Sequence, residues 1–270
     1  MSTLPTSVRK SANLVYHFAQ RESKARYKRS LLGWFWSFAN PLTTVLVYSF
    51  AFGKVFGATA PTTDNGNAEN FGLFLFTGLI VWSLFIGVIN GCMGWLDGVS
   101  QLRKKIYFPT ETALLGGAMS SAIQTSLEAA VLLAIMILAI NISWTAVFLL
   151  VALVLALAFA LGIGFVAAIL NARYRDVQYL VGVLLNAGFF LVPIIYPLSF
   201  VPDTAYGLPA KNLVEWTPPA VFVDIARDGA YFLQVPSLTK LLIGFGYSAA
   251  TFTVGWFYFR ARSMEISEEP

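Results

Sequence analysis

Residues that could carry out nucleophilic, redox or metal chemistry are scarce in this sequence. It contains one histidine, His17, and one cysteine, Cys92. Together they can build neither a metal site nor a Cys–His nucleophilic pair, and a disulfide within the chain is impossible. No GxxxxGK[ST] phosphate-binding loop occurs, because the only Gly-Lys pair, Gly53-Lys54, is followed by Val55. We therefore expect no catalytic residue, no metal and no nucleotide site in this chain.

Two polar side chains stand inside a long apolar stretch, where their cost is high. Gln124 and Glu128 lie one helical turn apart within residues 113–140. A charged side chain at the centre of a membrane helix costs roughly 2.5–3.5 kcal/mol on insertion scales, so it is usually paired or functional. Both a hydrogen-bonded packing role and a transport role fit this pair. An ion-coupled carrier generally needs a relay of several such groups, which one carboxylate does not supply.

The composition indicates an integral membrane protein. Hydrophobic residues make up 57% of the chain, charged residues 12%, and the mean hydropathy is +0.68, which is too apolar for a soluble core to bury. A helix needs ~20 mostly apolar residues to cross a bilayer. We predict an all-α fold with one transmembrane domain over residues 1–270. The six predicted spans are residues 33–56, 71–91, 113–140, 146–170, 177–197 and 240–259.

The distribution of Lys and Arg predicts the orientation of these spans. Cytoplasmic loops of membrane proteins carry an excess of both residues. Most of the 18 Lys and Arg residues precede the first span, follow the second or the fourth, or end the chain. The opposite side holds only Lys54, Lys211, Arg227 and Lys240. Both termini are therefore expected in the cytoplasm.

The segment before the first span, residues 1–30, has the pattern of a basic amphipathic helix. Apolar residues that include Ala12, Val15, Phe18 and Ala19 gather on one side of a helical wheel, and basic and polar residues gather on the other. Such a helix should lie in the plane of the membrane interface. The alternative is a disordered basic tail.

The predicted cytoplasmic loop 92–112 has a second amphipathic pattern. Trp95, Val99, Leu102 and Ile106 are spaced i, i+4, i+7 and i+11, with Arg103 and Lys104 on the opposite side. This spacing predicts a surface helix that ends before Pro109. The helix could rest on lipid or offer a ridge to a soluble partner, and periodicity does not decide between the two.

A short charged turn separates the fourth and fifth predicted spans. Arg173, Arg175 and Asp176 interrupt two long uncharged runs. The two arginines can hold the turn in water and against anionic lipid. Asp176 is placed to cap the N-terminus of the fifth span.

The longest external connection is predicted at residues 199–238, where five prolines divide the chain. Thr217-Pro218 has the form of a helix start and Gly229 that of a helix stop. The short helix between them could be an external cap or could dip into the outer leaflet. Its expected apolar side holds Val221, Phe222, Ile225 and Ala226, and its expected polar side holds Asp224, Arg227 and Asp228.

Aromatic residues are numerous near the ends of the first and fifth spans. Most aromatic side chains in such positions form interfacial belts or pack between helices. Some could line a passage, because flat rings stack on sugar faces. The candidates are Trp34, Trp36, Phe38, Tyr48, Phe189, Phe190 and Tyr196.

Four sequence blocks resemble one known family. KRSLLGWFWSFANP (28–41), RKKIYFP (103–109), NARYRDVQY (171–179) and VPIIYPLSFVP (192–202) are similar to signatures of ABC exporter permeases that move polysaccharides and polyol phosphates. The blocks occur in the family's order along nearly the whole chain. A departure is Thr217-Pro218, where the family often has Asn-Pro.

The resemblance implies a homodimer of six-span subunits in the bacterial inner membrane, bound to two copies of a separate P-loop ATPase. ATP and Mg²⁺ would sit on that partner, and the cargo would be a lipid-linked polysaccharide; no nucleic acid is expected. The loop 92–112 would hold a coupling helix, and the external segment would form re-entrant helices. The expected ATPase-binding residues are Trp95, Val99, Leu102, Arg103, Lys104, Ile106, Arg173, Arg175 and Asp176.

An ion-coupled secondary carrier of a small solute is the alternative function. Glu128 is the residue that favours it. The two halves of the sequence show no convincing inverted repeat, which weakens this alternative.

Overall fold

The computed structural model describes residues 6–26, 28, 30, 32–57, 60–63, 70–106 and 108–263. Regular secondary structure in these residues is helical, apart from one isolated bridge between Ala205 and Leu208. The helices are α1 (Thr6–Arg26), α2 (Trp36–Tyr48), α3 (Phe71–Gly98), α4 (Ser100–Arg103), α5 (Glu111–Leu138), α6 (Val147–Arg173), α7 (Val177–Leu191), α8 (Ala210–Glu215), α9 (Pro218–Ala230) and α10 (Leu238–Arg262). Short 3₁₀ turns at Gly33–Phe35, Trp144–Ala146 and Leu198–Phe200 and a π-helix at Ser49–Val55 complete the set.

Three helices among the described residues are long and apolar enough to cross a bilayer. They are Phe71–Gly98, Glu111–Leu138 and Trp144–Arg173, and the apolar helix Val177–Leu191 is shorter. Helices also occupy the ranges predicted for the first and sixth spans, as α2 with its π-helical continuation and as α10. The all-α character is confirmed, whereas the presence of six spans stays a prediction.

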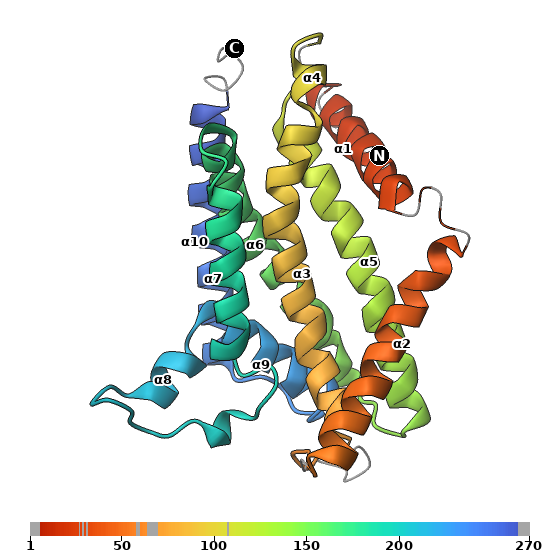
Figure 1. The fold of residues 1–270 in the computed structure, drawn as a ribbon, viewed down its shortest axis with the longest axis vertical. Helices are drawn as coiled ribbons and strands as arrows, with labels where there is room; N and C mark the ends of the chain where they lie inside the picture. The colour runs from red at the N-terminus through yellow and green to blue at the C-terminus, as the bar shows by residue number, and fades with distance from the viewer. Residues whose placement is uncertain are drawn as a thin grey trace.

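The long helices form a bundle in which α3 and α6 are central. α3 packs against α5, α6 and α9, and α6 packs along α10. In Figure 1 the helices α3, α5, α6, α7 and α10 follow the long axis, α2 is inclined across one side, and α8 and α9 lie at one end. Gly162 on α6 and Gly255 on α10 meet backbone to backbone, because a Cβ on either residue would overlap main-chain atoms of the other helix. Small residues permit such close helix packing in membranes.

The N-terminal segment is helical over Thr6–Arg26, as predicted, and protein covers part of its apolar side, at Phe18 and Ala19, while Ala12 is exposed. Phe18 and Ala19 are buried against Gly116 of α5, which has no side chain to keep α1 away. The Ser23 and Ser120 hydroxyls lie 2.9 Å apart in a hydrogen bond, and the Arg21 Nη2 donates to the Gly98 carbonyl at 3.1 Å. α1 is therefore a packed element of the bundle, and its place in the membrane interface stays a prediction.

The surface helix predicted across Trp95–Ile106 is wrong as one element. α3 continues to Gly98, so Trp95 belongs to this long helix, and only the four-residue α4 follows. The Trp95 ring occupies the space left by Gly117 of α5, and Val99 is buried. Packing these two apolar side chains between helices gains more hydrophobic free energy than leaving them on an exposed surface helix.

Two smaller expectations at the ends of α7 also need correction. Asp176 occupies the N-cap position but makes no side-chain cap; instead, the Asn171 Oδ1 accepts the Gln178 amide hydrogen at 3.1 Å. α7 ends at Leu191 and not at residue 197. Val192 is extended because it precedes Pro193, and a residue before proline disfavours the helical conformation.

Candidate functional site

The predicted cytoplasmic and external residues lie at opposite ends of the bundle. α4, the α6–α7 turn and the C-terminal end of α10 occupy one end in Figure 1, and α8 and α9 occupy the other. The Arg260 Nε and Nη2 both donate to the Glu111 Oε1, at 3.2 and 3.0 Å, which ties the end of α10 to the start of α5. This pair braces the end that carries the predicted partner-binding residues.

The predicted partner-binding residues near α4 divide into a packed set and an exposed set. Trp95 and Val99 pack between helices, whereas Leu102 and Ile106 are 36% and 55% exposed. Arg103 is half-buried, and this burial lowers the pKa of its guanidinium, which Asp97 partly opposes. An exposed Leu–Ile pair beside basic residues is a surface that a soluble partner can cover.

The α6–α7 turn presents charged residues at the same end. Arg173, Arg175 and Asp176 are all exposed, as is Lys104 beside α4. The Arg173 guanidinium lies 5.6 Å from the centre of the Tyr174 ring. These side chains are therefore accessible, and their role in binding a partner stays a prediction.

A chain of hydrogen bonds joins α2 to the polar residues of α5. The buried Ser37 hydroxyl donates to the Gln124 Oε1 at 3.1 Å, and the Gln124 Nε2 donates to the Glu128 Oε1 at 3.3 Å. The structure thus places Gln124 and Glu128 in contact, as their spacing indicates. It adds Ser37, which no periodicity in the sequence connects to them.

Glu128 also lines a cavity of about 330 Å³ between α2, α3 and α5. Polar residues from all three helices contribute to its wall, and two aromatic rings complete it. The residues that matter for its chemistry are Asn40, Thr44, Tyr48, Phe76, Ser83 and Glu128.

The predicted passage aromatics fall into a group on α2 and a group at the end of α7. Trp36 and Phe38 are exposed on α2, and the Trp34 side chain lies outside the described residues. Tyr48 is half-buried, with its ring stacked 5.9 Å from that of Phe52. These α2 aromatics are divided between accessible and packed positions.

The group at the end of α7 has one member with a structural role. Phe190 is exposed, and the Phe189 ring lies 6.2 Å from Trp82 of α3. The Tyr196 hydroxyl donates to the carbonyls of Phe190 and Leu191, both at 3.0 Å. Tyr196 therefore satisfies carbonyls that the end of the helix leaves without partners.

Arg227 occupies a central position that differs from the sequence prediction. The helical pattern predicts it on the polar side of α9, yet it is only 3% exposed. Its Nη1 and Nη2 donate to the Pro193 and Ile194 carbonyls at 2.5 and 2.6 Å, and its Nε donates to the Phe74 carbonyl at 3.4 Å. Its guanidinium also lies 3.7 Å from the centre of the Phe74 ring. Arg227 thus joins α3, α9 and the irregular segment after α7.

A signal for this site was present in the motif VPIIYP. Pro193 and Pro197 stop the helix inside an apolar run, and non-helical carbonyls at membrane depth need donors from the protein. The acidic residues of α9 are satisfied separately, because the Lys240 Nζ lies 3.2 Å from the Asp224 Oδ2 and 3.8 Å from the Asp228 Oδ2.

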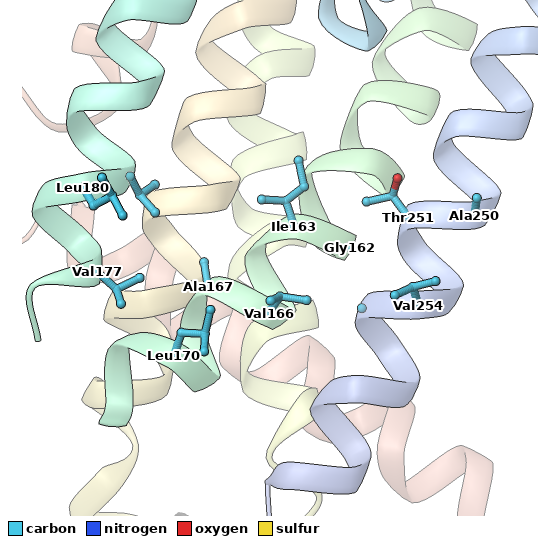
Figure 2. A pocket seen from close by; sticks show the side chains of 12 residues that line it. Gly162, Ile163, Val166, Ala167, Leu170, Val177, Leu180, Ala250, Thr251 and Val254 are labelled. Atoms are coloured by element: carbon cyan, nitrogen blue, oxygen red, sulfur yellow. The ribbon is translucent and has the colours of Figure 1, made fainter. Parts of the chain in front are cut away.

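An apolar groove of about 560 Å³ runs between α6, α7 and α10. In Figure 2, Ile163 and Val166 of α6 lie between Val177 and Leu180 of α7 on one side and Val254 of α10 on the other. Hydrocarbon fits such a lining, whereas the hydroxyl groups of a sugar would find few partners there.

Long apolar helices that bury small residues and buried polar networks define a polytopic helical membrane protein. The chain belongs to the ABC-2 type transporter family, whose profile matches residues 13–217.

Three relatives resemble the chain over most of its length. It is 28% identical over 257 residues to the O-antigen export system permease protein RfbA of Myxococcus xanthus, covering 94% of both chains. It is 27% identical to the protein of that name from Klebsiella pneumoniae, covering 78% of this chain and 83% of the relative. It is 24% identical to the polysialic acid transport protein KpsM of Escherichia coli, covering 90% of both.

Proposed function

We propose that this chain is the permease subunit of an ATP-driven exporter that moves a lipid-linked polysaccharide across the bacterial inner membrane. The observation that carries the proposal is the similarity to the O-antigen export permease, which covers 94% of both chains. ATP hydrolysis, with its Mg²⁺, belongs to a separate P-loop subunit in this proposal. Both termini and the α4 end face the cytoplasm, where that subunit binds.

A homodimer is supported by the apolar side chains that α7 and α2 leave exposed in a single subunit. Leu185 is the one buried residue of α7. α2 likewise exposes apolar residues along its length, including Leu42 and Leu46. A second copy that covers these faces would create a passage between the subunits, with the α2 and α7 aromatics near it. Stacking on such rings suits a sliding polymer, because each contact is worth only ~1 kcal/mol.

Depletion of the protein tests this function directly. We expect an undecaprenyl-type lipid-linked glycan to accumulate on the cytoplasmic leaflet while its surface form disappears, because synthesis continues without export. Surface labelling with a lectin or antiserum, together with extraction of lipid-linked glycan, measures both. Complementation by the wild-type chain is the control. Depletion that leaves every surface glycan intact, in cells without a second copy, would refute polysaccharide export and favour the ion-coupled carrier that Glu128 suggests.

Single cysteines test the proposed orientation in a Cys92→Ala background, since native Cys92 is buried. Cysteine at the exposed Tyr206, between α7 and α8, should react with an impermeant maleimide from outside the cell. Cysteine at Arg173 should react only after permeabilisation. External labelling of the Arg173 position would reverse the orientation. Asp64, another position predicted to be external, lies outside the described residues.

A further inference from the structure

We propose that the cavity between α2, α3 and α5 is a binding site for a single sugar ring, with the Glu128 carboxylate as its central hydrogen-bond acceptor. This inference rests on the proposed function, because the sugar would belong to the exported polymer. It adds to that function a site whose lining comes from one subunit.

The size of the cavity suits one ring. Its volume of about 330 Å³ lies at the lower end of the ~300–1,000 Å³ range of small-molecule pockets. An oligosaccharide would not fit inside. One residue of a longer chain would fit, provided that the cavity opens to the surface.

The cavity does open, through polar residues. Asn40 of α2 and Ser83 of α3 both line it and are exposed, whereas Phe76 and Ile80 at its inner wall are buried. α5 contributes Glu128 to the wall, and this side chain is half-buried. A ligand that enters past the exposed Asn40 and Ser83 can therefore reach the carboxylate.

The position of Glu128 is set by hydrogen bonds from residues that are not part of the cavity lining. The Gln124 amide donates to its Oε1 at 3.3 Å, and the Ser37 hydroxyl in turn holds the Gln124 Oε1 at 3.1 Å. A carboxylate that accepts one hydrogen bond from an amide still has lone pairs on both oxygens for further donors. Among the described residues that line the cavity, Glu128 alone is charged, so a ligand rich in hydroxyl donors satisfies it better than a hydrocarbon chain does.

The other walls match the two surfaces of a sugar. Ser83 and Asn40 can donate to and accept from hydroxyl groups, and Thr44, whose hydroxyl donates to the Asn40 carbonyl at 2.9 Å, keeps its acceptor capacity. Tyr48 and Phe76 supply aromatic surface for the apolar face of a ring. A small cation coordinated by the oxygens would not fill the space beside the two aromatic rings, whereas a sugar ring would contact both the oxygens and the rings. A sugar is therefore the better occupant.

Binding can be measured on the purified full-length chain in micelles by saturation-transfer NMR. The probes are the methyl glycosides of glucose, galactose, mannose and N-acetylglucosamine. Glu128→Gln removes the charge while keeping the shape, and Ser83→Leu fills the mouth. We expect saturable binding of at least one glycoside, weakened about tenfold by either variant because a charge-assisted hydrogen bond or access is lost. Ser126→Ala on the exposed side of α5 is the matched control and should bind as the wild type does.

Several outcomes would overturn the inference. They are the absence of saturable binding to the wild type, unchanged binding by both variants, and a Glu128-dependent rise in melting temperature caused by Na⁺ in place of glycosides. If Glu128→Gln does not fold, Ser83→Leu decides alone. Lost export on depletion without glycoside binding would refute the site and leave the function intact. Glycoside binding with intact surface glycans after depletion would refute the function and leave the site.

Discussion

Replacement of Arg227 by methionine is expected to lower the stability of the protein by about 3 kcal/mol or more. The substitution keeps much of the side-chain volume but removes the donors that hold the Pro193, Ile194 and Phe74 carbonyls. Removing the buried charge returns some free energy, because a desolvated cation is itself costly. The free-energy cost of leaving these carbonyls without donors in an apolar environment is larger than this gain.

Thermal unfolding of the detergent-purified chain measures the effect of Arg227→Met. Arg175→Met is the matched control, because Arg175 is exposed in the α6–α7 turn and should change the melting temperature little. Arg227→Lys should also destabilise, since one ammonium group cannot reproduce the fork of the guanidinium. Equal melting temperatures for Arg227→Met and the wild type would show that the three carbonyls do not depend on Arg227.

Replacement of Leu102 and Ile106 by aspartate should release the proposed ATPase subunit without unfolding the permease. Both side chains are exposed, so the change leaves the bundle intact, but it places two carboxylates where the partner would bury apolar surface. We expect at least a tenfold loss of co-purified ATPase, because two desolvated charges without partners cost more than 1.4 kcal/mol. Co-purification and ATPase activity of the complex in nanodiscs are the measurements.

The structure also supplies two controls for this experiment. Gln101→Asp adds a charge at an adjacent exposed position and should leave the complex intact. Val99→Asp should reduce the amount of folded protein instead, because Val99 is buried. If the double aspartate variant retains full ATPase binding and transport, α4 is a lipid-resting element and the partner binds elsewhere.

Elements with strong local signals were predictable from the sequence. The apolar runs that became α3, α5 and α6 are long enough that no other structure satisfies their backbone in a membrane. Thr217-Pro218 marked the start of α9, because proline is favoured in the first helical turn. The Gln124–Glu128 contact followed from spacing alone, since residues four apart share one face of a helix.

Other features depended on contacts with a neighbouring helix. Trp95 follows the amphipathic pattern of a surface residue, and the space left by Gly117 on α5, together with Gly91 on α3, makes it a packing residue. Asp176 has the residue type and position of a cap, yet the Asn171 side chain takes the bond. Residue type and helical periodicity do not predict either contact, because each depends on how two helices are placed relative to each other.

From the sequence, the all-helical character of this chain and the approximate places of its long apolar helices were predictable. Length, hydropathy and proline positions act locally, and the bilayer leaves the backbone few alternatives. The roles of the polar residues between and within those helices depend on the tertiary structure. Arg227 is a buried donor to the segment after α7, and Glu128 forms part of the wall of a cavity. Both roles depend on the tertiary structure, because buried polar groups find their partners on the helices that pack beside them.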